Sequence, residues 1–168
     1  VRIFNGGNQM IKFTDLHVHT EYSLQDGMIR ISDANDPKHI KGEIIKNAER
    51  RNTGAVAATD HGNMYGQAIL ASVCNTFGFK HIPGCEFYIA TDSRHDKSYS
   101  RRGEAYMHIN AWAKNREGYS NMCMLQKVSY DEGFYYVPRI DKELIEKYHS
   151  GIIWSDACVG GTICTHIL

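Results

Sequence analysis

Two histidines separated by a single residue are the part of this sequence best suited to chemistry. His17 and His19 flank Val18 in an apolar run, and a strand there would point both imidazoles to the same face. Two imidazoles on one face are a common metal-ligand arrangement. Taken alone, the pair is explained equally well by two structural histidines, so its interpretation depends on the rest of the chain.

Further potential ligands follow, each at or near the end of a short run that is typical of a strand: His61, Glu86, His108 and Cys158. Singly, a histidine or cysteine in such a run is more often a core residue. Asp26 before Gly27 fits a turn, and Asp60 could cap the next helix. Glu86 differs, because an unpaired carboxylate is costly to bury and a cation is its better partner. The recurring series favours one shared metal site.

The donor types indicate which chemistry such a site could perform. Imidazole, carboxylate and thiolate together suit zinc, and the nitrogen and oxygen donors also admit manganese or iron. Divalent cations about 3.5–4 Å apart assist phosphoryl chemistry, because they polarise the oxygens on phosphorus and lower the pKa of water. Phosphoester hydrolysis is therefore the favoured reaction. The sequence has no phosphate-binding P-loop, no Gly-x-Ser-x-Gly elbow and no Gly-x-Gly-x-x-Gly fingerprint.

Alternating strand-like and helix-like segments would position these side chains. The patterns predict strands at residues 11–18, 54–59, 80–90, 106–113 and 151–155, and helices at 37–51, 66–77, 118–132 and 141–148. This alternation predicts an α/β fold with a mostly parallel sheet, whose carboxyl strand ends gather functional side chains. Residues 92–104 are polar and aperiodic, which predicts a mobile surface loop. Residues 1–10 are predicted to be an N-terminal extension of one domain at 11–168.

Composition narrows the class of protein. The 168 residues, 42% of them hydrophobic, suffice for one sizeable core. Nineteen basic residues balance nineteen acidic ones, so any contact with nucleic acid must be local or depend on bound cations. No apolar run approaches the roughly 20 residues of a membrane helix. Five cysteines without a Cys-x-x-Cys pair, and no signal peptide, predict a cytoplasmic location.

Five blocks of sequence carry a family resemblance. They read DLHVHTEYSLQDG at 15–27, TDHGNMYG at 59–66, IPGCEFYIA at 82–90, AKNREGY at 113–119 and EGFYYVPRID at 132–141. Together they resemble the PHP (polymerase and histidinol phosphatase) domain of bacterial DNA polymerase III alpha subunits, the C-family replicative polymerases. The last block favours this branch over stand-alone phosphatases of the histidinol phosphatase type, which are the alternative.

The resemblance implies a distorted (β/α)7 barrel with up to three divalent metal ions, zinc, manganese or iron, in its mouth. The implied ligands form three sets: His17, His19 and Glu86; Glu86, His108 and Cys158; Asp26 and His61. Glu86, His61 and His19 are the implied catalytic residues, with Glu86 bridging two ions and His61 orienting water or the leaving group.

Metal-binding members of the family are linked to 3′ to 5′ proofreading, whereas members with eroded ligands act as scaffolds that dock a proofreading subunit. Every ligand position reached here is of the metal-binding type. The resemblance thus implies a metal-dependent phosphoesterase resembling a 3′–5′ exonuclease, with DNA as partner through the full-length polymerase and a proofreading exonuclease subunit as a second candidate partner. The family pattern continues to a late aspartate and histidine, so we expect the barrel and the site to be incomplete at Leu168, and the palm carboxylates of polymerisation to be absent.

Overall fold

The computed structural model describes residues 12–33, 41–99 and 105–162. Its elements, in chain order, are α1 (Glu43–Arg50), β1 (Ala55–Ala58), α2 (Gln67–Phe77), β2 (Lys80–Ala90), β3 (Tyr106–Ala113), α3 (Arg116–Asp131), β4 (Arg139–Ile140), α4 (Lys142–Tyr148) and β5 (Ile152–Asp156). The predicted α/β class is confirmed. The predicted extension at 1–10 lies outside the described residues.

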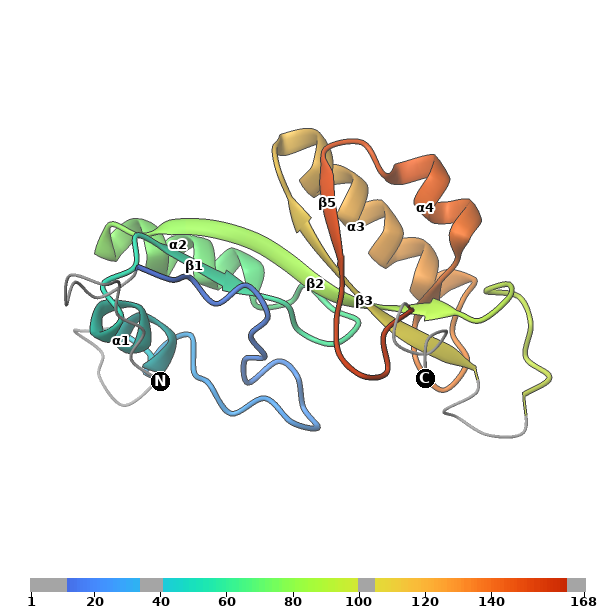
Figure 1. Cartoon of the computed structure of the whole chain (residues 1–168), viewed down its shortest axis with the longest axis horizontal. Helices are drawn as coiled ribbons and strands as arrows, with labels where there is room; N and C mark the ends of the chain where they lie inside the picture. The colour runs from blue at the N-terminus through green and yellow to red at the C-terminus, as the bar shows by residue number, and fades with distance from the viewer. Residues whose placement is uncertain (1–11, 34–40, 100–104, 163–168) are drawn as a thin grey trace, which may run out of the picture.

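Strand β2 is the longest element of a mixed sheet and runs through most of the molecule (Figure 1). The strand order is β1-β2-β3-β5, with β4 also paired to β2. β1 and β4 run parallel to β2, but β3 is antiparallel to β2 and β5 is antiparallel to β3. The predicted mostly parallel sheet is therefore wrong. The connection from β2 to β3 contains no helix in its described part, and parallel neighbours need a long crossover, usually a helix.

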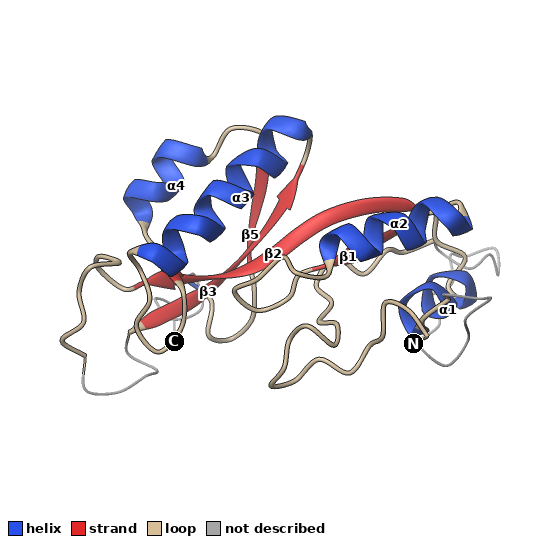
Figure 2. Ribbon diagram, turned by 180° about the vertical axis from the view of Figure 1, so that it is seen from behind, coloured by secondary structure: helices blue, strands red, loops and turns tan. Residues whose placement is uncertain are grey.

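The two faces of the sheet differ in character. Cys85 and Phe87 of β2 pack with Met122 and Leu125 of α3 in one buried apolar cluster, and α3 and α4 lie together on this side of the sheet (Figure 2). Because side chains alternate along a strand, Glu86 points to the opposite face. The apolar face thus anchors the sheet to its helices, and the other face is available for chemistry.

Side-chain caps and one close approach set the starts of the last two helices. Asn115 accepts a hydrogen bond from the backbone N–H of Gly118 at 2.9 Å, and Asp141 accepts one from that of Leu144 at 3.1 Å. A Cβ atom on Gly118 would lie 1.9 Å from the carbonyl oxygen of Gly151. Only glycine therefore allows α3 to pack this closely against the turn before β5.

The strand predicted at residues 11–18 is not formed over its described part, 12–18. Val18 instead makes a single local pairing beside β1. Its N–H donates to the hydroxyl of Thr59 at 3.0 Å, and the N–H of Thr59 donates to its carbonyl at 2.8 Å. A side-chain oxygen replaces the backbone acceptor that would continue a ladder, so regular pairing does not develop.

Residues 92–99, the described part of the polar segment at 92–104, are irregular as predicted, and two buried arginines make contacts there. Arg94 is only 7% exposed, and its guanidinium binds Asp141 at 2.9 Å and Glu132 at 2.8 Å. Arg139, which is fully buried, donates to the carbonyls of Arg94 at 3.0 Å and Asp96 at 2.8 Å. The mobility predicted for this segment stays a prediction, and residues 100–104 lie outside the described part of the chain.

Gln67, at the start of α2, joins two strands through its buried amide. Its Nε2 donates to the carbonyls of Ala58 at 3.1 Å and Gly84 at 2.9 Å. Its Oε1 is thereby left to accept a hydrogen bond from Nε2 of His81 at 2.9 Å. Burial lowers the pKa of His81 to about 4, so the imidazole is neutral at pH 7.

This histidine should make stability depend on pH. Between its ordinary pKa of 6.5 and about 4, His81 binds a proton in the unfolded chain but not in the folded one, so the free energy of unfolding should fall as the pH is lowered through this window. Urea unfolding at pH 7 and pH 4.5 measures the fall. His81→Asn should reduce it by about 2 kcal/mol, and the exposed His149→Asn should leave it unchanged. Equal falls in the parent and His81→Asn would contradict the prediction.

The described part of the chain has no helix with the length and apolar character needed to span a membrane.

Candidate metal centre

Histidines and carboxylates from separate segments meet on the sheet face opposite α3 and α4. The residues are His17, His19, Asp26, His61, Glu86 and His108. Their donor atoms form three overlapping groups, within each of which the atoms lie no more than 4.8 Å apart: His17, His19 and Glu86; His19, Asp26 and His61; His61, Glu86 and His108. The structure therefore brings together all the predicted ligands except Cys158.

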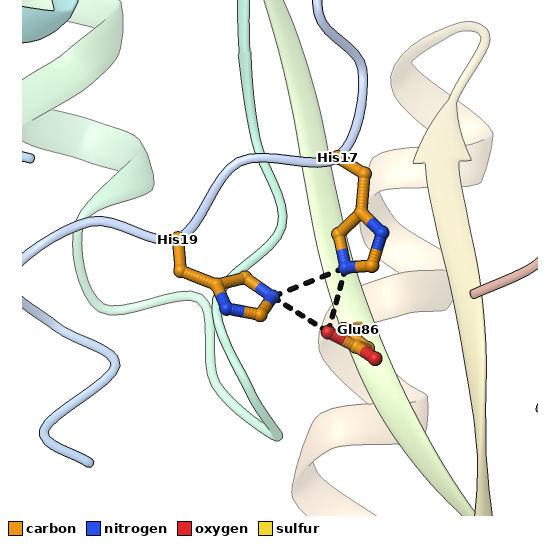
Figure 3. Close-up of side chains that lie close together, drawn as sticks. All are labelled: His17, His19 and Glu86. Atoms are coloured by element: carbon orange, nitrogen blue, oxygen red, sulfur yellow. Dashed lines mark hydrogen bonds and ion pairs between the residues drawn. The ribbon is translucent and has the colours of Figure 1, made fainter. Parts of the chain in front are cut away.

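Glu86 lies at the centre of the cluster and is only 1% exposed. Its Oε2 lies 2.9 Å from Nε2 of His17 and 2.6 Å from Nε2 of His19, and its Oε1 lies 2.9 Å from Nδ1 of His108. Figure 3 shows the first two imidazoles turned toward the carboxylate on β2. Burial alone would raise the pKa of Glu86, but the hydrogen bonds from His108, His17 and His19 outweigh it and hold the pKa well below its usual range.

Asp26 joins two of the histidines on the exposed side of the cluster. Its Oδ2 lies 2.9 Å from Nδ1 of His19 and 3.2 Å from Nε2 of His61. Burial lowers the pKa of His19, but hydrogen bonds and charge from Glu86 and Asp26 outweigh it, so the pKa is raised. For His61 burial prevails and the pKa is lowered. Two neighbouring imidazoles thus differ in their readiness to hold a second proton.

Cys158 lies near this cluster but belongs to none of its three groups. Its Sγ is 3.7 Å from Nδ1 of His108, and its side chain is exposed. The backbone N–H of His108 donates to the carbonyl of Gly160 at 3.0 Å, which holds this segment beside β3. The assignment of Cys158 as a ligand stays a prediction.

The sequence predicts that all the ligands lie at the carboxyl ends of strands, but the structure places only some of them there. His61 follows the end of β1, but Glu86 lies within β2 and His108 lies near the start of β3. The antiparallel register, which places Tyr88 opposite His108, explains the difference. The amino end of β3 meets the carboxyl half of β2, so both strands present ligands at one level.

Sequence reasoning missed the residue that holds the first histidine segment in place. Asp60 is fully buried and accepts hydrogen bonds from the N–H of Thr20 at 2.7 Å, its hydroxyl at 2.8 Å and the hydroxyl of Ser23 at 2.9 Å. It does not cap α2, whose N-cap residue is Gly66. A carboxylate at the end of a buried strand was the available signal, since such a group needs partners.

The donor set fits divalent cations better than protons. Nε2 of His17 and Nε2 of His19 lie 3.1 Å apart while both face Oε2 of Glu86, so two N–H groups there would point toward each other. Nδ1 of His61 is buried, has no hydrogen-bond partner and lies 3.4 Å from the same oxygen. Imidazole nitrogen and carboxylate oxygen converging in this way are typical ligands of zinc, and of manganese or iron.

A pocket of about 620 Å³ lies at the end of β2 away from the metal-ligand cluster. Lys80, Trp112 and Tyr119 are among its lining residues, and its one histidine is His81, whose imidazole is bonded to Gln67. It lacks a cluster of metal-ligand side chains, so it is not the candidate metal centre.

The chain is similar in sequence to members of one protein family. A model of the PHP domain family matches residues 15–168. DNA polymerase III subunit alpha of Borreliella burgdorferi is 42% identical over 94% of this chain and 13% of that protein, and the subunit of Treponema pallidum is 38% identical over 91% of this chain and 12% of that protein. A putative metal-dependent phosphoesterase of known structure from Bifidobacterium adolescentis aligns with 70% of this chain and 33% of that chain, at 14% identity and a TM-score of 0.43.

The predicted family resemblance is confirmed, although the chain spans only about an eighth of the length of these curated relatives. The chain belongs to the PHP domain family, and its similar relatives are alpha subunits of bacterial DNA polymerase III.

Proposed function

We propose that this chain is the PHP domain of a replicative DNA polymerase III alpha subunit and that its metal centre hydrolyses the terminal phosphodiester of a DNA strand, as a 3′–5′ proofreading exonuclease does. The observation that supports hydrolysis is the set of three overlapping ligand groups, two of which share Glu86. The identity of 42% over 94% of the chain supports the parent protein.

The family resemblance assigns one divalent ion, zinc, manganese or iron, to each of three ligand sets that overlap these groups. His17, His19 and Glu86 would bind the first, Glu86 and His108 the second with Cys158 as a further ligand, and Asp26 with His61 the third. Such ions supply Lewis acidity to a phosphate, which favours attack by water and departure of the leaving oxygen.

The protein side chains would orient the reacting groups. Glu86 is fixed by imidazoles bonded to both of its oxygens, so its carboxylate cannot rotate away. Nε2 of His61 lies 3.2 Å from Oδ2 of Asp26, the residue with which it would hold the third ion. From this position His61 would orient a water molecule or the leaving group, while Nδ1 of His19 stays in contact with Oδ2 of Asp26.

Metal analysis combined with a nuclease assay tests this function. A full-length polymerase subunit that carries this domain should contain at least one zinc, manganese or iron ion in the domain and should release the 3′ nucleotide from a mismatched primer. A chelator should stop the release, and added metal should restore it. His19→Ala should lower the rate at least 100-fold, while the exposed His149→Ala should keep it. A protein that holds metal but releases no nucleotide would be a scaffold, and one that hydrolyses only histidinol phosphate would be a phosphatase; either result would overturn the proposal.

A further inference from the structure

A pocket of about 360 Å³ opens beside His61, and four of its nine lining residues are tyrosines. The four rings come from separate segments: Tyr22, Tyr65, Tyr88 and Tyr130. Ser23, Leu24, Gln25 and Asn63 complete the lining. None of these described lining residues is a lysine, arginine, aspartate or glutamate. The pocket is therefore aromatic and uncharged, and it adjoins the metal centre through His61.

The inner wall of the pocket is fixed by packing against the metal centre. The Tyr88 ring stacks on the imidazole of His61, with centroids 5.7 Å apart and an interplanar angle of 12°. Gly62, with φ of +59°, makes this stacking possible, because a Cβ atom there would lie 2.7 Å from the Tyr88 ring. The ring cannot move far without moving the ligand histidine.

The outer wall is joined across two segments and is open to solvent. The hydroxyl of Tyr65, in the turn after β1, donates to the hydroxyl of Tyr130 on α3 at 3.2 Å. Their exposed fractions are 62% and 39%, and that of Leu24 is 94%. Large exposed side chains around one concave pocket are typical of a ligand site.

We propose that this pocket binds the nucleobase of the terminal nucleotide, an inference that rests on the proposed phosphodiesterase function. The substrate phosphate would lie at the metal centre, and His61, shared by both sites, places the pocket within one nucleotide of it. Tyrosine faces stack on any base, so the pocket would accept all four. A neutral lining suits a base and offers no cation to a phosphate.

The size of the pocket restricts which DNA ends can react. A volume of about 360 Å³ is near the lower end of the range for small-molecule sites. It suits one base, whereas the end of a duplex carries two bases with their sugars and backbones. The terminal base must therefore leave its partner before it enters. An unpaired or mismatched end does this most easily, so this pocket would select frayed ends for hydrolysis.

Tyr65 is the best position for a test, because its side chain is largely exposed and its replacement should leave the fold intact. Tyr65→Leu removes the ring, whereas Tyr65→Phe keeps the ring and loses only the hydroxyl. The substrates are the dinucleotide TpT and the same compound with an abasic 3′ sugar. The parent and Tyr65→Phe should show a KM about 10-fold or more lower for TpT than for the abasic compound, and Tyr65→Leu should not distinguish them.

Saturation-transfer NMR on protein whose metal has been removed with a chelator measures base binding without catalysis. Thymidine monophosphate should receive saturation through its base in the parent and in Tyr65→Phe, but not in Tyr65→Leu, and ribose 5-phosphate should not displace it. The base site would be overturned if TpT and the abasic compound were hydrolysed with equal KM, or if ribose 5-phosphate displaced thymidine monophosphate. Either result would leave the phosphodiesterase function intact. If the protein bound the base but hydrolysed neither compound, the proposed function would be overturned instead.

Discussion

Replacing Glu86 by glutamine should weaken metal binding at least 100-fold and abolish metal-dependent hydrolysis. Glu86 contributes donor atoms to two of the three ligand groups, so a single change affects both. Glutamine has nearly the same shape but no charge, and its amide would present N–H groups toward imidazoles that now face a carboxylate. Metal titration by calorimetry and release of nucleotide from a mismatched primer are the two measurements.

Glu146→Gln makes the same chemical change on the exposed surface of α4. It should bind metal and hydrolyse DNA as the parent does. If Glu86→Gln kept the metal content and the rate of the parent, Glu86 would not be a ligand and the arrangement of the three groups would have to be abandoned.

Asp60→Ala should lower the free energy of unfolding by about 4 kcal/mol. The change removes the acceptor of three buried hydrogen bonds, from the N–H and hydroxyl of Thr20 and the hydroxyl of Ser23. The backbone N–H of Thr20 would then be buried without an acceptor, and a small cavity would form beside it. Asp60→Asn keeps the shape and one acceptor oxygen, so it should cost about half as much.

Urea unfolding monitored by circular dichroism gives these differences. Asp131→Ala is the matched control, because Asp131 lies exposed at the end of α3 and its carboxylate pairs with Lys127 one turn earlier; its effect should stay within about 0.5 kcal/mol. Equal unfolding curves for the Asp60 and Asp131 variants would show that the buried hydrogen bonds do not hold the histidine segment.

Local sequence patterns predicted most elements, because helix and strand periodicity is a local property. The predicted strand at 80–90 coincides with β2, and the predicted helix at 66–77 differs from α2 by one residue. The direction of β3 was missed because strand pairing depends on distant residues. The two-residue β4 is too short to leave a periodic signal.

The sequence predicted which residues form the candidate site better than it predicted how they are arranged. Glu86 stood out because a carboxylate in an apolar strand needs a partner, and the structure surrounds it with imidazoles. His17 and His19 do face the same way, but without the strand that was predicted to align them. The contact of Asp60 with Thr20, 40 positions earlier, has no signature in either local segment.

The hydrogen bonds that Thr59 and Asp60 make to the segment at 18–23 involve no ligand side chain. The donors of the first ion are consequently spaced by the scaffold before any cation arrives, and binding need not organise a disordered loop. Choice among zinc, manganese and iron then falls to coordination preference and to the supply of each ion in the cell. Such a centre could exchange one metal for another while the polypeptide around it stays the same.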